Sequence, residues 1–503
     1  MKLIFTMLLL LQAASQSVAS EPKSLQFSIT HNGAIAEKLS GRVYVMMTKG
    51  AIPPLGGPDW WNPEPFFAQD VEDWMSGEPL IINHSADNMG VPPSQIGEGP
   101  WKAVSVYRSQ NDSCRLAAPG GLYGEAVIIT NSPLEAGTIS LEVNTPVPDR
   151  EWKEHKNLRL DEKQSPMLSE FFNRDVMHGA CVIVPDDYDQ NRVEPYPVMY
   201  WIGGFNSDHY GGRFMKALYT GSDYDDQICR VVLNAQCYGG HHGFADSENN
   251  GPRLTALMQE FIPYLESKYN LGGSPAKRHI SGHSSGGWAS LWMLLNYPDF
   301  FRGAWALAPD PVDFRHFQTC DIYAENANVY SDAEGKERPV AREGESPILY
   351  YRGFTKMDDV IKDGGVVGSF EWQFSPRGDD GRPVHLFNRS SGKIDRRIAE
   401  YWKQYDILHQ LKANWNTLSP KLIGKINIVA AEFDTFYFED AVFAMNDFFT
   451  EEDFDAYIEI VEGGSHGDVF RTSVIRKMDE WFARTLQLTN NQSPMFGPEP
   501  LEP

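Results

Sequence analysis

One pentapeptide near the middle of the chain constrains its fold more than any other feature: Gly282-His283-Ser284-Ser285-Gly286, of the form G-x-S-x-G. The residues before it, 277–281, are typical of a short strand, and the apolar run 287–295 indicates a helix. A strand, a tight turn and a helix form the setting of a nucleophile elbow, in which the serine hydroxyl is exposed. The alternative interpretation is a Gly/Ser turn before a buried helix.

The two ends of the chain differ from the rest in composition. Lys2, the apolar run 3–11 and the small residues 18–20 have the pattern of an export signal over residues 1–20. The apolar run is too short to span a bilayer, which favours a cleaved signal over an uncleaved anchor. We therefore expect a periplasmic or secreted protein without stable membrane insertion. The Pro-rich tail 488–503 is predicted to be disordered.

Charge and cysteine content limit the partners. The 503 residues carry a formal net charge of −24, which argues against nucleic acid and anionic membranes, because both demand basic patches. The five cysteines have neither a C-x-x-C motif nor the spacing of metal ligands, so we expect no metal site. One or two disulfides and five buried free thiols are both compatible with this set. The sequence does not determine the oligomeric state.

Alternating apolar and polar residues predict an all-β unit over residues 21–146. Five segments carry the pattern, with Gly, Pro and Asn turns between them: 25–29, 41–45, 101–107, 124–129 and 138–143. Short strands of this kind favour an immunoglobulin-like β-sandwich. The stretch 59–74 is aromatic and lacks periodicity. It is a carbohydrate-stacking surface or, as we favour, a plug at the end of the sandwich or an interface between domains.

Strands and helices alternate over residues 178–487, after a charged segment, 147–177, that is expected to be a linker with a short helix. This alternation predicts a mostly parallel sheet with helices on both faces. The pattern breaks at about 314–422, which we interpret as a cap-like insertion over the active site rather than a surface elaboration. Its tryptophans Trp372 and Trp402 are candidate substrate-binding residues.

Candidate partners for the serine follow later strands of the predicted sheet. A serine nucleophile needs a base to take its proton, and the base needs an acid to hold its tautomer. The predicted strand 426–431 leads to Glu432 and Asp434, and a Gly-rich loop after the last strand carries His466. This order predicts a triad of Ser284, Asp434 and His466. Glu432 is the competing acid, because residues two apart in a strand share a face.

An oxyanion hole requires two backbone N–H donors close to the nucleophile. The sequence predicts Ser285, directly after the nucleophile, and Phe205, in the Gly-Gly turn after strand 197–202, with Gly204 as the alternative. His283 is too close to Ser284 in sequence to be its base, and we expect it to pack or to line the pocket. Three more histidines lie on loops without the partners of a metal site: His209, His241 and His242.

Several motifs of the α/β part carry a family resemblance. They are the elbow, Gly203-Gly204-Phe205, Phe244-Ala245-Asp246-Ser247 with Asn250-Gly251-Pro252, Phe261-Ile262-Pro263-Tyr264-Leu265-Glu266, and Tyr297-Pro298-Asp299-Phe300-Phe301. Together they resemble the putative esterase family, which includes enterochelin, feruloyl and acetylxylan esterases, S-formylglutathione hydrolases and mycolyltransferases. The resemblance covers about 181–311 and, more loosely, 426–481.

The resemblance implies an α/β-hydrolase fold with a triad at Ser284, Asp434 and His466. A β-sandwich before the catalytic domain resembles the arrangement of enterochelin esterases. Two departures keep the substrate class from being carried over. Ser285 stands where the family has a small residue or methionine, and the insertion has no counterpart.

Together these features predict an exported serine hydrolase that cleaves carboxylic esters through an acyl-enzyme, without a cofactor. The expected substrate is a small-molecule or carbohydrate-linked ester. An acyltransferase or a peptidase with the same triad is the alternative, because the sequence does not separate water from another acceptor. A non-catalytic binding protein on a hydrolase fold is the third possibility, since fold alone does not prove activity.

Overall fold

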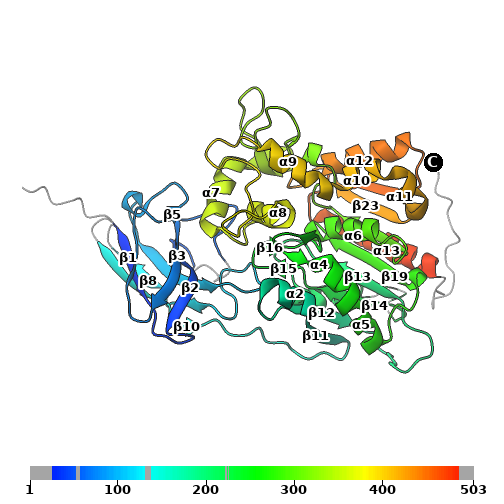
Figure 1. Ribbon diagram of the computed structural model, residues 1–503, viewed down its shortest axis with the longest axis horizontal. Helices are drawn as coiled ribbons and strands as arrows, with labels where there is room; N and C mark the ends of the chain where they lie inside the picture. Colours follow the sequence, from blue (N-terminus) through cyan, green and yellow to red (C-terminus); the bar gives the residue numbers. More distant parts are fainter. Residues whose placement is uncertain are drawn as a thin grey trace, which may run out of the picture.

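A computed structural model describes residues 25–486, except for 52–56, 131–136, 221, 223 and 225. The predicted export signal 1–20 and the tail 488–503 lie outside these residues. Figure 1 shows the N-terminal strands (blue) beside the larger α/β part, with the insertion (yellow) next to both. Within the described ranges, no helix combines the length and the apolarity needed to cross a bilayer.

Strands β1 to β10 form two sheets. The smaller sheet has the order β4–β1–β9: β4 (Leu80–Ile82), β1 (Gln26–Thr30) and β9 (Thr138–Glu142). The larger sheet has the order β10–β7–β6–β2–β3–β5, and β8 also pairs with β6. Its strands are β10 (Thr145–Pro146), β7 (Leu122–Tyr123), β6 (Trp101–Ser109), β2 (Lys38–Thr48), β3 (Phe66–Met75), β5 (Asp87–Asn88) and β8 (Val127–Ile129). Phe27 of β1 and Val43 of β2 belong to one hydrophobic cluster, so the sheets pack face to face.

The larger sheet is covered on both faces. Along β2, Val43 and Val45 enter the cluster between the two sheets, whereas Tyr44 and Met46 enter the main cluster shared with the α/β part. This is the two-residue period of a strand. Its partner β3 begins inside the aromatic stretch 59–74. Its first three residues are all buried, because both faces are covered there, and this hides the alternation.

Residues 147–177, expected to be a linker with a short helix, contain that helix and also contribute an unexpected strand to the α/β part. They contain β11 (Leu158–Gln164) and α2 (Pro166–Phe172). β11 pairs antiparallel with β12 (Met177–Ile183) over seven residues and forms an edge of the central sheet. Edge strands tolerate charged residues on their open side, so a segment with the charged composition of a linker forms a strand here.

The central sheet has the order β11–β12–β14–β13–β19–β20–β23–β24. Its other strands are β14 (Cys229–Leu233), β13 (Val198–Ile202), β19 (Arg278–His283), β20 (Gly303–Leu307), β23 (Ile426–Ala431) and β24 (Tyr457–Val461). All pairings from β14 to β24 are parallel, and both pairings of β12 are antiparallel. The five cysteines are buried and unpaired: Cys114, Cys181, Cys229, Cys237 and Cys320.

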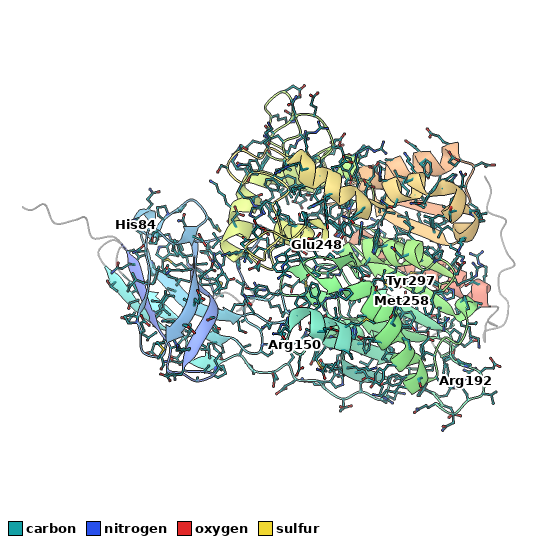
Figure 2. The ribbon with its side chains drawn as sticks, viewed as in Figure 1. His84, Arg150, Arg192, Glu248, Met258 and Tyr297 are labelled. Carbon is teal, nitrogen blue, oxygen red and sulfur yellow. The ribbon has the colours of Figure 1, made fainter. Side chains whose placement is uncertain are left out.

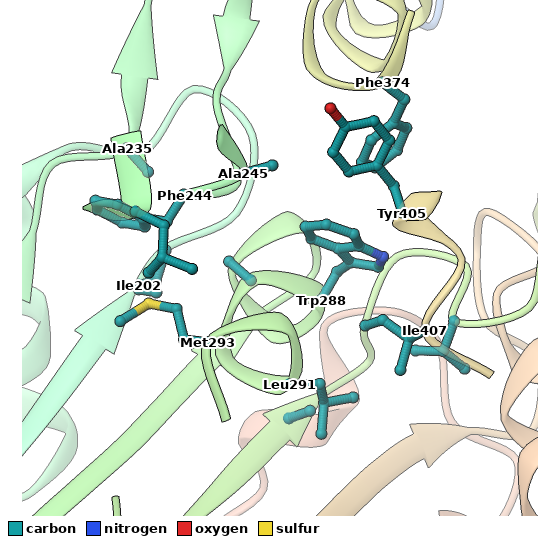
Figure 3. Close-up of a cluster of buried hydrophobic side chains, with 14 of the residues drawn as sticks. Ile202, Ala235, Phe244, Ala245, Trp288, Leu291, Met293, Phe374, Tyr405 and Ile407 are labelled. Atoms are coloured by element: carbon teal, nitrogen blue, oxygen red, sulfur yellow. The ribbon is translucent and has the colours of Figure 1, made fainter. Parts of the chain in front are cut away.

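Helices cover both faces of this sheet, as the strand–helix alternation predicts. One face packs against α3 (Gly212–Leu218) and α13 (Thr472–Leu486). The other packs against α4 (Arg253–Ala256), a π-helical turn (Leu257–Phe261), α5 (Ile262–Tyr269), α6 (Ser285–Asn296) and α12 (Glu439–Glu451). Figure 3 shows α6 buried between the sheet and the insertion, with Met293 near Ile202 and Trp288 near Phe374. The Trp288 and Phe374 rings are 5.0 Å apart.

The insertion contains one hairpin and several helices. These are β21 (Pro339–Glu343), β22 (Ser346–Tyr350), α7 (Tyr351–Ile361), α8 (Val366–Phe374), α9 (Arg396–Trp402), α10 (Ile407–Ala413) and α11 (Trp415–Leu422). Helix α10 of the insertion packs against α6 of the α/β part. Glu248 ties the two parts together (Figure 2): it accepts hydrogen bonds from the Tyr401 hydroxyl at 2.6 Å and the Arg377 amide at 2.9 Å.

Candidate active site

Ser284 occupies the turn between β19 and α6. Its backbone angles are φ 58° and ψ −124°, a left-handed region that costs a non-glycine residue free energy. The two glycines of the motif permit the close approach of strand and helix. A Cβ on Gly282 would lie 2.1 Å from the Gly286 oxygen, and one on Gly286 would lie 2.0 Å from the Ile202 oxygen. The segment therefore has the strand–turn–helix geometry expected of an elbow.

His466 and Asp434 meet at the carboxyl ends of β24 and β23. The Nδ1 of His466 lies 2.7 Å from Asp434 Oδ2, which fixes the tautomer with the proton on Nδ1 and leaves Nε2 as the acceptor. Burial alone would lower the pKa of His466, but the adjacent Asp434 carboxylate outweighs burial and raises the pKa above its ordinary value. Glu432, the competing acid, instead accepts a 2.7 Å hydrogen bond from the Gly463 amide.

A second acid, Asp310, lies beside Ser284. The Ser284 hydroxyl donates to Asp310 Oδ1 over 3.2 Å, and the Ser285 hydroxyl donates to Oδ2 over 2.6 Å. Asp310 is 4% exposed, and its burial raises the pKa of its carboxyl to about 6. Among the described contacts, Ser284 makes no hydrogen bond to His466. Hydrogen bonds between catalytic groups are often long or misaligned without substrate.

Asp310 was not among the residues that the sequence singled out. It follows β20 by three residues and therefore lies at the same edge of the sheet as Ser284, Asp434 and His466. A search for every acid just after a predicted strand would have found it.

The turn after β13 lies against the elbow. A Cβ on Gly204 would come 3.0 Å from Ser284 Cβ. In the part of the chain that the structure describes, the amides of Phe205 and Ser285 donate to no protein acceptor, and both residues line the cavity at Ser284. The Gly203 carbonyl lies 3.1 Å from His241 Nε2. Two backbone donors are thus free to face a ligand oxygen beside Ser284.

The other singled-out histidines have structural partners. His283 Nε2 lies 3.2 Å from the His466 carbonyl, and burial lowers the pKa of His283 to about 3, so it stays neutral. His209 Nε2 contacts Glu162 at 3.2 Å, and His242 Nδ1 accepts from the Phe244 amide at 3.1 Å. Over the described residues, no three His, Cys, Asp or Glu side chains gather as metal ligands do.

A cavity of about 400 Å³ contains Ser284, Asp310 and His466. Its wall comes from three parts of the chain: the N-terminal loop, the α/β part and the insertion. The apolar and aromatic wall residues are Trp60, Trp61, Phe205, Phe317, Val329, Val340, Leu349, Tyr351, Phe354, Val366, Val367, Phe370, Leu386, Phe387, Trp402, Phe436 and Phe438. Trp402 thus lines the cavity. Trp372 does not: it packs against Tyr238 and donates from Nε1 to Asp363 at 3.0 Å.

The strand order, with Ser284 after β19, an acid after β23 and a histidine after β24, is that of the α/β-hydrolase fold. Residues 170–416 match the model of the family described as Putative esterase, which confirms the resemblance seen in the sequence. The matched region includes Ser284 and the turn at Phe205, whereas Asp434 and His466 follow it. The match supports ester hydrolysis in general terms. No curated protein matches the chain.

Several solved structures are similar at low identity. The fluorophosphonate-binding serine hydrolase F of Staphylococcus aureus is 14% identical, with 65% of this chain and 98% of that chain covered and a TM-score of 0.39. The S-formylglutathione hydrolase of Agrobacterium tumefaciens is 15% identical, with 66% of this chain and 98% of that chain covered and a TM-score of 0.39. A ferulic acid esterase of Anaeromyces mucronatus is 13% identical, with 65% of this chain and 92% of that chain covered and a TM-score of 0.33. At these values the substrates of these proteins are not carried over to this chain.

Proposed function

We propose that the protein is a serine esterase that hydrolyses carboxylic esters through Ser284, His466 and Asp434. The observation that carries this proposal is the 2.7 Å contact between His466 Nδ1 and Asp434 beside the elbow serine, within one largely apolar cavity. A serine in an unfavourable backbone conformation next to a buried His–Asp pair has no evident packing role. It is the arrangement that activates a hydroxyl for nucleophilic attack.

The reaction begins when His466 Nε2 takes the proton of the Ser284 hydroxyl and Ser284 Oγ attacks the ester carbonyl carbon. The carbonyl oxygen becomes an oxyanion, which the amides of Ser285 and Phe205 stabilise. His466 then gives the proton to the leaving alcohol as the carbon–oxygen bond breaks. Water attacks the acyl-enzyme with His466 again as the base, which releases the acid and restores Ser284. Asp434 stays ionised and holds the His466 tautomer.

In the resting arrangement, the Ser284 hydroxyl bonds to Asp310 rather than to His466. The reaction therefore requires the hydroxyl to rotate toward His466 Nε2 when the ester enters. Rotation about one side-chain torsion is fast compared with catalysis, so this step does not limit turnover.

The test is a fluorophosphonate probe together with an ester assay. The purified wild-type protein should be labelled on Ser284 and should hydrolyse a short nitrophenyl ester. Ser284→Ala should lose labelling and at least about 10³-fold in kcat while it keeps its circular dichroism spectrum. Ser473→Ala, on the exposed side of α13, is the matched control and should keep full activity. Hydrolysis by Ser284→Ala above a tenth of wild type, or labelling of another serine, contradicts the proposal.

We also propose that the protein is exported and that its N-terminal sheets are an immunoglobulin-like sandwich. Lys2, the apolar run and the small residues up to Ser20 support export. The shared cluster of the two N-terminal sheets supports the sandwich. Mass spectrometry of periplasmic or secreted protein should find an N-terminus close to Glu21. Recovery of intact Met1 from the cytoplasm contradicts export.

A further inference from the structure

Two tryptophans outside the family match reach the cavity. Trp60 and Trp61 lie on the N-terminal loop before β3, and both line the cavity that contains Ser284. The Trp60 ring lies 5.2 Å from Phe354 of α7. The Trp61 ring stacks on Phe436 at 6.2 Å, with 26° between the planes. The aromatic stretch read as a plug or an interface thus forms part of the cavity wall.

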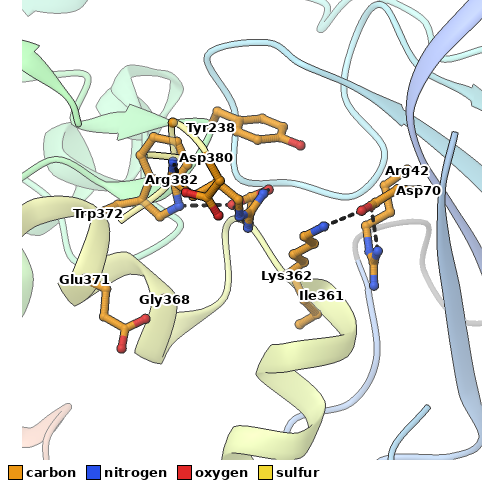
Figure 4. A network of polar contacts seen from close by, with 12 residues as sticks. Arg42, Asp70, Tyr238, Ile361, Lys362, Gly368, Glu371, Trp372, Asp380 and Arg382 are labelled. Atoms are coloured by element: carbon orange, nitrogen blue, oxygen red, sulfur yellow. Dashed lines mark hydrogen bonds and ion pairs between the residues drawn. The ribbon is translucent and has the colours of Figure 1, made fainter. Parts of the chain in front are cut away.

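The sheet that carries this loop is fixed to the insertion. Arg42, which is 2% exposed, donates to the Val360 carbonyl from Nε at 3.1 Å and from Nη2 at 2.9 Å. The Tyr44 hydroxyl donates to the Ile361 carbonyl at 2.9 Å. Figure 4 shows Asp70 between Arg42 and Lys362, the residue that follows α7. These contacts hold the N-terminal sheet against the end of α7.

The position of Trp61 identifies which half of an ester it faces. His466 must give its proton to the leaving alcohol, so the alcohol oxygen lies at the His466 ring. Phe436 and Phe438 flank that ring, at 5.1 and 5.6 Å between centroids. Trp61 stacks on Phe436. Trp61 is thus linked through Phe436 to the His466 ring, which receives and returns the proton on the alcohol side of the ester.

The charge of the wall limits the occupant. Among the described residues that line the cavity there is no Lys or Arg, while Asp310 and Glu371 are acidic. Glu371 is paired with Arg389 at 2.7 Å and with His385 at 2.8 Å, so it is not free to bind a cation. An anionic alcohol would gain no counter-charge from these lining residues and would lie in the same cavity as the acidic Asp310. The aromatic wall instead suits an uncharged ring, which stacks or packs edge-on against Trp and Phe.

We propose that Trp60, Trp61 and Phe436 form an outer subsite that binds the uncharged, aromatic alcohol group of the ester. This inference rests on the proposed function and adds the substrate class and the side of the ester. It makes the N-terminal unit a specificity-determining part of the enzyme rather than an independent module.

The experiment compares two acetates, which differ only in the alcohol, in the full-length protein. Trp61→Ala should lower kcat/KM for 2-naphthylmethyl acetate by about fivefold, mainly through KM, and for ethyl acetate by less than about twofold. Trp61→Phe should keep most of the preference. Phe443→Ala, an exposed aromatic of α12 that does not line the cavity, is the matched control and should change neither ester.

Two more arms test the side and the charge. Ethyl 2-naphthoate places the same ring on the acyl half of the ester. For this ester, Trp61→Ala should keep a kcat/KM within about twofold of the wild-type value. Wild-type enzyme should hydrolyse benzyl acetate at least about tenfold better than its para-carboxylate. Equal losses on both acetates, a loss confined to the naphthoate, or equal rates for benzyl acetate and its carboxylate each overturn the proposal. Failure of the proposed function would differ, since the wild type would then neither label at Ser284 nor hydrolyse any ester.

Discussion

Asp310 Oδ1 lies 3.2 Å from the Ser284 hydroxyl oxygen, so a buried carboxyl, and not the histidine, holds the nucleophile of the resting site. The same carboxyl accepts a hydrogen bond from Ser285, and the Asp310 amide donates to the Ser284 carbonyl at 3.1 Å. Asp310 therefore fixes the elbow through both its backbone and its side chain. Its burial raises the pKa of its carboxyl, so ionisation of Asp310 near neutral pH costs the fold free energy.

Replacing Asp310 by Asn should change how stability depends on pH. The pKa of this carboxyl is raised from 3.8 to about 6, so the folded protein holds the proton more tightly than the unfolded chain. The group therefore favours folding below about pH 4, and this contribution is lost as pH rises through 6. Relative to wild type, Asp310→Asn should gain roughly 2–3 kcal/mol of unfolding free energy between pH 4 and pH 7.

Urea denaturation at several pH values measures this gain. Asp187→Asn, at an exposed position, is the control and should follow wild type at every pH. A constant difference between Asp310→Asn and wild type from pH 4 to 7 would show that Asp310 keeps the same charge throughout.

Asp434→Asn should lower kcat by about 10³-fold or more, because the amide no longer holds the His466 tautomer. It should also lower the pKa of the ascending limb of the pH profile of kcat/KM. Asp434 raises the pKa of His466, and catalysis requires the neutral ring. Glu432→Gln is the matched control, since the Glu432 carboxylate accepts from the Gly463 amide and makes no contact with His466 among the described hydrogen bonds. If Glu432→Gln loses most of its kcat while Asp434→Asn remains active, Glu432 and not Asp434 is the acid that orients His466.

The tryptophans of the insertion should behave differently from each other. Trp402 lines the cavity, so Trp402→Leu should enlarge it and raise kcat/KM for bulky esters relative to small ones, by about threefold. Trp372→Leu should leave that ratio unchanged, because the side chain packs outside the cavity on Tyr238 and Gly239. Kinetics on acetate and bulky acyl esters of one alcohol give the ratio. If Trp402→Leu and Trp372→Leu give the same ratio of kcat/KM for bulky over small esters, Trp402 affects only folding and does not limit substrate size.

Arg42→Met should destabilise the protein by about 2–3 kcal/mol, because it leaves the Val360 carbonyl unpaired at a buried interface. Lys38→Met, which removes an exposed ion pair with Asp73 at 3.8 Å, should cost under about 0.5 kcal/mol. Urea unfolding followed by tryptophan fluorescence measures both. Equal, small effects would show that the N-terminal sheet is held without Arg42.

The sequence by itself determined the features that depend on local pattern. The glycines around Ser284 specify a strand–turn–helix, because only residues without Cβ permit that approach. The alternation of strands and helices predicts the central sheet, and chain order places Asp434 and His466 at its carboxyl edge. These signals lie within short windows and need no knowledge of distant contacts.

Only the tertiary structure decided which side chains surround Ser284. Asp310 carries no local motif, and Trp60 reaches Phe354 across almost three hundred residues of chain. The first residues of β3 show no alternation of apolar and polar side chains, because both faces of the strand are buried there. Strand β11 has the charged composition of a linker, because an edge strand can carry charge. Trp372 and Trp402 look alike in composition, yet only one faces the cavity. Such outcomes depend on how separate elements pack, and composition and periodicity within one segment do not encode that packing.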